Sequence, residues 1–145
     1  MSVEQTTATR NQSTAIISEA NRVFIFDNRY VEGVFKNNTG ADFELSHGQL
    51  VVRDVTVADG FLPATAANLA NVIGVSAYEG KTTLAAGATR NINIGTKGTI
   101  IGLALVLPAG VTLLTTVGNK TLKDVLEGLG FHVDTSTVEN TKLEN

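Results

Sequence analysis

The sequence predicts a mainly β fold, namely a small β-barrel or sandwich-like domain with one short C-terminal helix and a flexible N-terminal arm. The first indication is composition: the chain has 14 glycines and only 2 prolines, and its ordered part is dominated by Val, Ile and Thr, which favour strands. The second is the regular return of short apolar or alternating runs between clusters of turn residues. The third is a single stretch of helical periodicity near the C-terminus.

The 145-residue chain is expected to form one domain flanked by two polar segments. Residues 1–21 are rich in Thr, Ser, Gln and Asn, a composition that cannot bury enough surface to fold alone. Ile16 and Ile17 form an apolar pair within them and are the candidate anchors through which this arm would order on a partner. Residues 22–133 are then the β-rich domain, and residues 134–145 a polar tail.

The first half of the domain is predicted to consist of short strands joined by turns. Residues 23–26, which are wholly apolar, and residues 30–36 are predicted to form two strands, and Asp27-Asn28 between them is a typical turn pair. Further strands are expected at residues 43–45, 50–57 and 72–75. Such closely spaced strands are typical of an all-β sandwich or barrel.

The second half contains the most apolar segment of the chain. A strand at residues 91–94 is predicted to end at Gly95, and a turn is predicted at Lys97-Gly98. Residues 99–107 would be the next strand, apolar on both faces, which places it in the centre of the fold or against a second subunit. The residues expected to make these oligomer or core contacts are Ile100, Ile101, Leu103, Leu105 and Leu107.

Residues 99–117 carry no charge and therefore have to be compared with a membrane span. A spanning helix needs about 20 predominantly apolar residues in sequence, whereas Pro108-Ala109-Gly110 lies near the centre of this segment and suits a turn. We expect two buried strands joined by that turn, and no membrane partner.

One helix is predicted, from Asn119 to about Leu129. Asn119 or Thr121 would be its N-cap, and Gly128 and Gly130 offer stop signals. Its apolar face consists of Leu122, Val125, Leu126 and Leu129. A closing strand is expected directly after Gly130.

No arrangement of residues in the sequence points to catalysis or to a bound cofactor. The chain has no cysteine and only two histidines, His47 and His132, which do not have a metal-binding spacing. No phosphate-binding glycine motif occurs, and the acidic residues lie mostly beside turns. We therefore expect a protein that is not an enzyme, with no catalytic residue, no metal site and no cofactor.

The charge pattern does not suit a nucleic-acid partner. The formal net charge is -3, and the 11 basic residues are scattered along the chain, whereas a phosphate-binding face needs clustered Lys and Arg. The first residues, MSVEQTTATRNQ, lack the apolar core of a signal peptide.

Three segments of the chain combine turns and strands in a characteristic order. LSHGQLVVRD (residues 45–54) has a turn, a glycine and a strand; DGFLPATAANLANVIGV (59–75) has Asp-Gly, Pro-Ala, a connector and Ile-Gly-Val. TTLAAGATRNINIGTKGTI (82–100) has an Ala-Gly turn and a strand that ends near a glycine. In this order, residues 45–98 resemble the head decoration, or capsid cement, proteins of tailed bacteriophages.

The resemblance implies a structural virion protein, small, β-rich and often trimeric, on the outer capsid surface. The implied partners are the major capsid protein and further copies of this chain, with a trimer favoured. The protein would be assembled in the host cytoplasm and would stabilise the coat lattice, its polar arm ordering on the capsid. The alternative is a virion-surface fibre base or a carbohydrate-binding β-domain. The absence of Trp disfavours a sugar site, which usually employs exposed aromatic side chains.

Overall fold

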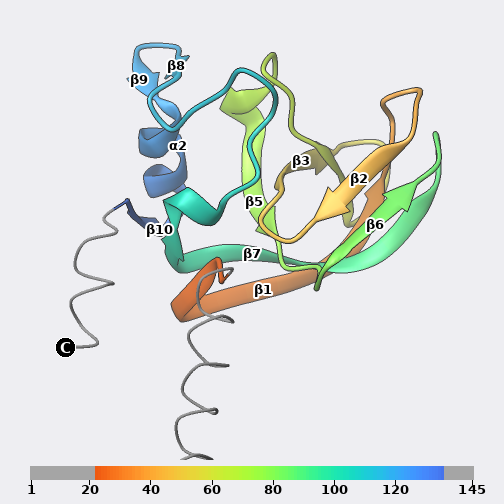
Figure 1. Ribbon diagram of the computed structural model, residues 1–145, viewed down its shortest axis with the longest axis horizontal. Helices are drawn as coiled ribbons and strands as arrows, with labels where there is room; N and C mark the ends of the chain where they lie inside the picture. The colour runs from red at the N-terminus through yellow and green to blue at the C-terminus, as the bar shows by residue number, and fades with distance from the viewer. Residues whose placement is uncertain (1–21, 136–145) are drawn as a thin grey trace, which may run out of the picture.

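The fold is a closed five-strand β-barrel with further elements attached to it (Figure 1). The computed structural model describes residues 22–135 and has 51% strand and 12% helix, so the predicted mainly β class is confirmed. Neighbouring strands pair around the barrel, and β1 pairs with β7 to close it. In order around the barrel the strands are β1 (Phe24–Lys36), β4 (Gly60–Pro63), β3 (Leu50–Asp54), β5 (Val72–Ser76) and β7 (Thr89–Ile101).

Three other strands extend this arrangement. β10 (Phe131–Asp134), the predicted closing strand, runs parallel to β7 and adds a sixth strand to the sheet. β2 (Phe43–Ser46) and β6 (Lys81–Leu84) form a separate antiparallel ribbon.

The remaining elements are short and lie in the connections. β8 (Thr116–Val117) and β9 (Lys120–Thr121) make a small hairpin that leads into the helix α2 (Leu122–Leu129). The 3-10 helix η1 (Leu69–Asn71) precedes β5, and η2 (Gly102–Ala104) follows β7.

The helix α2 lies where the sequence predicts one. Of the two candidate caps, Thr121 is the N-cap: its Oγ1 accepts a hydrogen bond from the Asp124 amide (3.2 Å), and Asp124 Oδ2 accepts one from the Thr121 amide (3.1 Å). This reciprocal pair is a capping box. The helix ends at Gly130, which has a left-handed φ of 112°. The buried residues of α2 are Leu122, Val125 and Leu126.

β1 continues through the turn that the sequence predicts at Asp27 and Asn28. These residues form a bulge, in which Asp27 has a φ of 53° and the pairing with β7 shifts register. The Asn28 Nδ2 donates to the carbonyl oxygens of Lys97 (3.3 Å) and Thr99 (3.1 Å). At the bulge, this side chain therefore replaces part of the backbone hydrogen bonding between β1 and β7. The predicted break is wrong because pairing with β7 outweighs the local turn preference.

β7 likewise runs through the turn predicted at Lys97-Gly98. Gly98 has a φ of 109°, and a Cβ atom there would lie 2.6 Å from the Asp27 carbonyl oxygen in β1. Gly95 makes similar room, because a Cβ atom there would collide with the Phe24 ring. In this strand the glycines therefore permit close contact with β1 and do not end the strand.

β7 stops at Ile101, well short of the strand predicted over residues 99–107. The chain then turns through η2 and continues as an irregular segment past β5 to the β8–β9 hairpin (Figure 1). The Val106 amide of this segment donates to the Gly48 carbonyl oxygen (2.9 Å). Leu105 and Leu107 of this segment pack partly buried against the core, and Val106 makes an isolated bridge with Gln49 in place of a full strand. The two buried strands predicted within residues 99–117 are therefore wrong beyond the end of β7.

β3 is buried on both faces. Leu50 and Val52 point to one side of the strand and Val51 to the other, and all three are at most 4% exposed. β3 ends at Asp54, whose Oδ1 accepts hydrogen bonds from the Thr56 amide (3.0 Å) and hydroxyl (2.6 Å). This turn explains why the predicted continuation of the strand to residue 57 is wrong.

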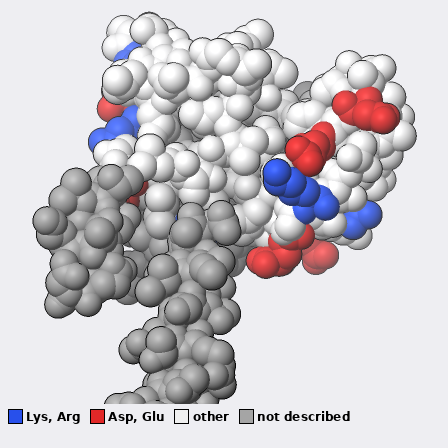
Figure 2. Space-filling model, in the orientation of Figure 1, with Lys and Arg blue, Asp and Glu red and all other residues white. Residues whose placement is uncertain are grey.

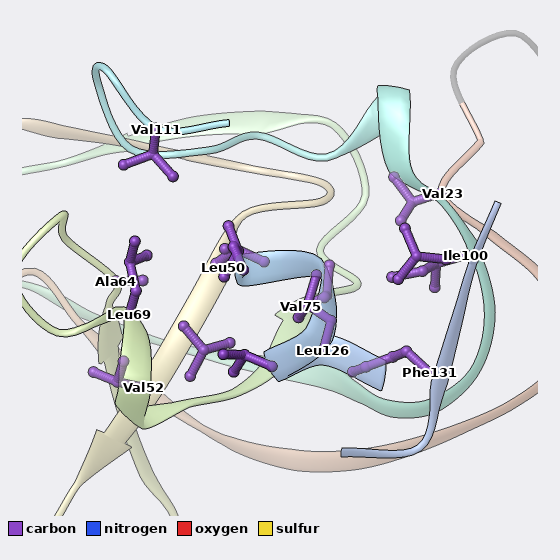
Figure 3. Packing of buried hydrophobic residues seen from close by; sticks show 14 of the residues in the cluster. Val23, Leu50, Val52, Ala64, Leu69, Val75, Ile100, Val111, Leu126 and Phe131 are labelled. Atoms are coloured by element: carbon purple, nitrogen blue, oxygen red, sulfur yellow. The ribbon is translucent and has the colours of Figure 1, made fainter. Parts of the chain in front are cut away.

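The core consists of two clusters on the two faces of β3. The larger cluster brings Leu126 of α2 and Phe131 of β10 against Leu50 and Val75 of the barrel (Figure 3). The smaller cluster lies around Val51 on the opposite face. The helix is therefore part of the core of the domain.

Candidate functional site

A groove of about 1050 Å³ opens beside the first residues of β1. It is formed by segments that are far apart in the sequence: the start of β1, the turns that follow β2 and β5, and the region around η2. The residues used below are Arg22 and Phe24 from the β1 side, His47 from the turn after β2, and Leu103 and Val106 from the η2 side. Because aromatic, aliphatic and charged side chains meet here, the groove is the candidate site.

Phe24 is the aromatic centre of the groove. Its ring lies edge-on to Tyr30, with centroids 5.3 Å apart, and edge-on to His47, with centroids 5.5 Å apart. Edge-to-face contacts of this kind are favourable for aromatic rings. Phe24 is 6% exposed, whereas Tyr30 is 49% exposed, so Tyr30 presents an aromatic surface to solvent beside a buried ring.

His47 is held in a turn that packs closely against η2. Its Nδ1 lies 3.1 Å from the carbonyl oxygen of Tyr78, which orients the ring. The next residue, Gly48, has a φ of 89°, and a Cβ atom there would lie 2.9 Å from the Ala104 carbonyl oxygen. Glycine is therefore required at this position for the turn to approach η2.

The side of the groove at η2 is aliphatic and open to solvent. Leu103 is 63% exposed and Val106 is 36% exposed. Arg22, Glu79 and Lys81 add charged groups around these apolar side chains. Exposed apolar side chains next to a concave surface are typical of a contact surface, so the groove has the chemistry of a binding surface.

Two carboxyl groups outside the groove have a lowered pKa, and local structure explains both. The hydroxyl and the amide of Thr56 donate to Asp54 and lower the pKa of that carboxyl. The Thr121 amide donates to Asp124 and lowers its pKa within the capping box. Each shift follows from a turn or a cap, so neither identifies an acid–base site.

The histidines do not come together in one site. His47 lines the groove, whereas His132 is exposed on β10 and does not line it. Within residues 22–135, no group of three or more His, Cys, Asp or Glu side chains could hold a metal ion. No helix in this part of the chain is long and apolar enough to cross a membrane.

The residues predicted to make oligomer or core contacts lie in different environments. Ile100 is fully buried in the larger core cluster, and Leu105 and Leu107 are partly buried against that cluster. Ile101 is half-buried at the end of β7, whereas Leu103 is exposed.

The proposed anchors of the arm, Ile16 and Ile17, lie outside the described residues. Sequence reasoning missed the groove, although it named Leu103 as a contact residue for another reason. Tyr30 and His47 carry no local signal of a shared site, because only the fold brings their segments together.

Figure 2 shows a second surface of interest, an area without charge. The Lys, Arg, Asp and Glu side chains visible in this view gather around the β2–β6 ribbon and beside α2. Between them runs the segment of residues 102–117, which contains no charged residue (Figures 1 and 2). Leu114, 76% exposed, and Leu103 lie on it. We call the exposed surface of residues 102–117 the uncharged face.

These features define a small closed-barrel β protein with a surface groove and an uncharged face. No protein-family model matches the chain, and no curated protein matches it in sequence.

Proposed function

We propose that this protein is a non-enzymatic capsid decoration protein that binds the outer surface of a bacteriophage capsid and stabilises its coat lattice. The observation that carries the proposal is the resemblance of residues 45–98. Residues 45–98 contain β3, β4, β5 and most of β7, so the resemblance covers four of the five barrel strands. A protein of this kind needs a rigid shape and contact surfaces. In keeping with this, every buried side-chain nitrogen and oxygen atom of the described residues has a hydrogen-bond partner.

The protein is proposed to act as a homo-oligomer, with a trimer favoured. The uncharged face supports self-association, because charged residues are depleted at the centres of protein interfaces. Leu114, which lies outside the groove, supplies an exposed aliphatic contact on this face. An uncharged surface is complementary to another uncharged surface, and a second copy of this chain offers one.

The N-terminal arm is proposed to anchor each copy on the major capsid protein through Ile16 and Ile17. The support is compositional, since the two isoleucines form an aliphatic pair in an otherwise polar segment. One such anchor is weak, but an oligomer engages several at once. Simultaneous engagement raises affinity by about 100- to 10,000-fold without any new type of contact.

A fibre base or carbohydrate-binding domain is the second candidate, and the groove is the observation that favours it. Tyr30 is half exposed there, and Asn93 and Glu79 lie in the same groove as polar partners for hydroxyl groups. A glycan that binds the wild type but not Tyr30→Ala, combined with no affinity for capsids, would favour this candidate.

The test of the main proposal is cosedimentation of the full-length protein with empty capsids of its own phage. We expect saturable binding, and weaker binding after deletion of residues 1–21, because the anchors are lost. Deletion of residues 136–145 is the matched control and should leave the affinity unchanged. A full-length protein that is monomeric and does not bind capsids contradicts the proposal. If the affinity for capsids is unchanged after deletion of residues 1–21, the arm is not the anchor.

A further inference from the structure

We infer that the groove binds the chain's own Ile16–Ile17 segment, so that the groove and the capsid compete for the same two side chains. The contact with the groove does not depend on the capsid. The competition rests on the proposed function, in which these isoleucines anchor the protein on the coat.

The first argument is reach. Arg22, with which the described chain begins, itself lines the groove. Ile17 precedes Arg22 by five residues and Ile16 precedes it by six. Since an extended chain spans at most about 3.6 Å per residue, the Cα atom of Ile17 lies within about 18 Å of the Cα atom of Arg22. The groove therefore lies within reach of the two isoleucines.

The second argument is chemistry. Leu103 and Val106 provide exposed aliphatic contacts on one side of the groove, and the Phe24–Tyr30 pair provides an aromatic surface. Covering these side chains with isoleucine removes apolar area from water on both partners. The other segment outside the described residues, residues 136–145, has no two adjacent apolar residues. The Ile16–Ile17 pair is thus the segment of this chain that the groove suits.

The third argument is the shortness of the connection. A short flexible linker gives its ligand an effective concentration in the millimolar range. In dilute solution this exceeds the concentration of arms from other oligomers. Within an oligomer the chain's own arm has the shortest connection, because Arg22 of the same chain lines the groove, so the chain's own arm is the inferred occupant.

A bound arm is not available to the capsid. The apparent affinity of a partner falls in proportion to the fraction of molecules in the competent state. Weakening the groove should therefore strengthen capsid binding, by about tenfold if nine-tenths of the arms are bound in the free protein. Weakening the arm should have the opposite effect.

Disulfide trapping in the full-length free protein tests the contact, because the natural chain has no cysteine. The double variant Ile17→Cys/Leu103→Cys should form an intramolecular disulfide under a mild oxidant. The product is a species of monomer mass with both thiols lost, seen by mass spectrometry without reductant. A disulfide needs Cα atoms within about 7 Å, so the trap reports direct proximity.

The matched control is Ile17→Cys/Val55→Cys. Val55 is 89% exposed and so equally open to reaction. Val55 directly follows Asp54, the last residue of β3, which pairs with Gly60 of β4. Gly60 in turn pairs with Val34 of β1. Val34 lies ten residues along β1 from the groove residue Phe24. Along a strand this corresponds to about 30 Å at the usual rise, compared with the roughly 18 Å or less that five residues can span.

Equal disulfide yields in the two variants would overturn the proposal. A disulfide-linked dimer formed in preference to the intramolecular product would also overturn it, because the occupant would then be a neighbour's arm. A measurement without cysteines provides a second check: Ile16→Ser/Ile17→Ser should shift the ring NMR signals of Tyr30 and His47. Unchanged ring signals would contradict the contact.

The competition is tested separately with empty capsids. Tyr30→Ala, which changes the groove outside the uncharged face, should raise the affinity for capsids, whereas Ile16→Ser/Ile17→Ser should lower it. If the wild type binds capsids and Tyr30→Ala does not bind more tightly, the competition is wrong. If no form binds capsids, the proposed function fails, while the trapping result still decides whether the groove holds the arm.

Discussion

Asn37 follows β1 and is fully buried. Its Nδ2 donates to the carbonyl oxygens of Ala41 (2.6 Å) and Leu84 (2.9 Å). Its Oδ1 accepts from the amide (3.0 Å) and the hydroxyl (2.7 Å) of Thr39. Because both ends of the amide are used, this one side chain joins the end of β1 to β6 and to the connection that precedes β2.

Replacing Asn37 by Asp should lower the free energy of unfolding by about 2–4 kcal/mol, because the carboxylate loses two donors and faces two carbonyl oxygens in a buried site. Urea denaturation measures the change. The neighbouring Asn38 is exposed, so Asn38→Asp adds the same charge and should stay within about 0.5 kcal/mol of the wild type. Similar losses in both variants would mean that the added charge, and not the buried amide, is responsible.

At the scale of the element, α2 depends on a charged capping box. The Thr121 amide donates to the Asp124 carboxylate and lowers its pKa below the ordinary value. A carboxyl group whose folded pKa is lower than its unfolded value, about 3.9, stabilises the fold at pH values above that unfolded value. The contribution is then lost as the pH falls through the lower, folded pKa.

Asp124→Asn should therefore lower the melting temperature at pH 7 and make it less dependent on pH below the unfolded pKa of about 3.9. Thermal unfolding followed by circular dichroism over a series of pH values measures both effects. Glu32→Gln, which removes an exposed carboxylate of β1, controls for the change in net charge. The same acid dependence in Asp124→Asn and the wild type would show that the capping box does not couple the helix to pH.

At the scale of the whole molecule, the uneven distribution of charge suggests where copies meet. The uncharged face lies between the charged surroundings of the β2–β6 ribbon and of α2 (Figure 2). Leu114, at 76% exposed, is a large aliphatic side chain on that face. A charge placed there would be buried without a partner in an interface and would weaken it strongly.

Leu114→Glu should therefore convert the oligomer to monomers while leaving the fold intact, as native mass spectrometry would show. Val55→Glu is the matched control: Val55 is 89% exposed and lies outside the uncharged face, so the mass should not change. An unchanged mass for Leu114→Glu would place the interface elsewhere. A monomeric wild type would contradict the proposed oligomer.

The helix and the fold class could be predicted from the sequence because their causes are local. The Thr121 cap, the apolar spacing of α2 and the Gly130 stop all act within a few residues of one another. The mainly β class follows from composition and from closely spaced turns, which need no knowledge of strand pairing. The segment without charge and the Ile16–Ile17 pair are likewise features of the sequence itself.

Tertiary structure decided where the long strands end and which strand is central. Asp27-Asn28 and Lys97-Gly98 are local turn signals, but they face each other in the paired strands β1 and β7. Pairing along the length of β1 and β7 outweighs the local preference of each residue pair for a turn. The strand buried on both faces is β3, because a core cluster packs on each side of it. Beyond the end of β7, Leu105 and Leu107 are only partly buried against the core.

The candidate site was the part least accessible to prediction. The groove joins the start of β1, the turn at His47 and the region around Leu103, and no local pattern relates these segments. Their proximity is created when β1 pairs with β7 and closes the barrel. The sequence by itself determined the class of fold, the helix and the apolar character of single segments, because these depend on neighbouring residues. The groove, and the exposure of the charge-free residues 102–117 as one face, depend on contacts between distant residues, so only the closed barrel decided them.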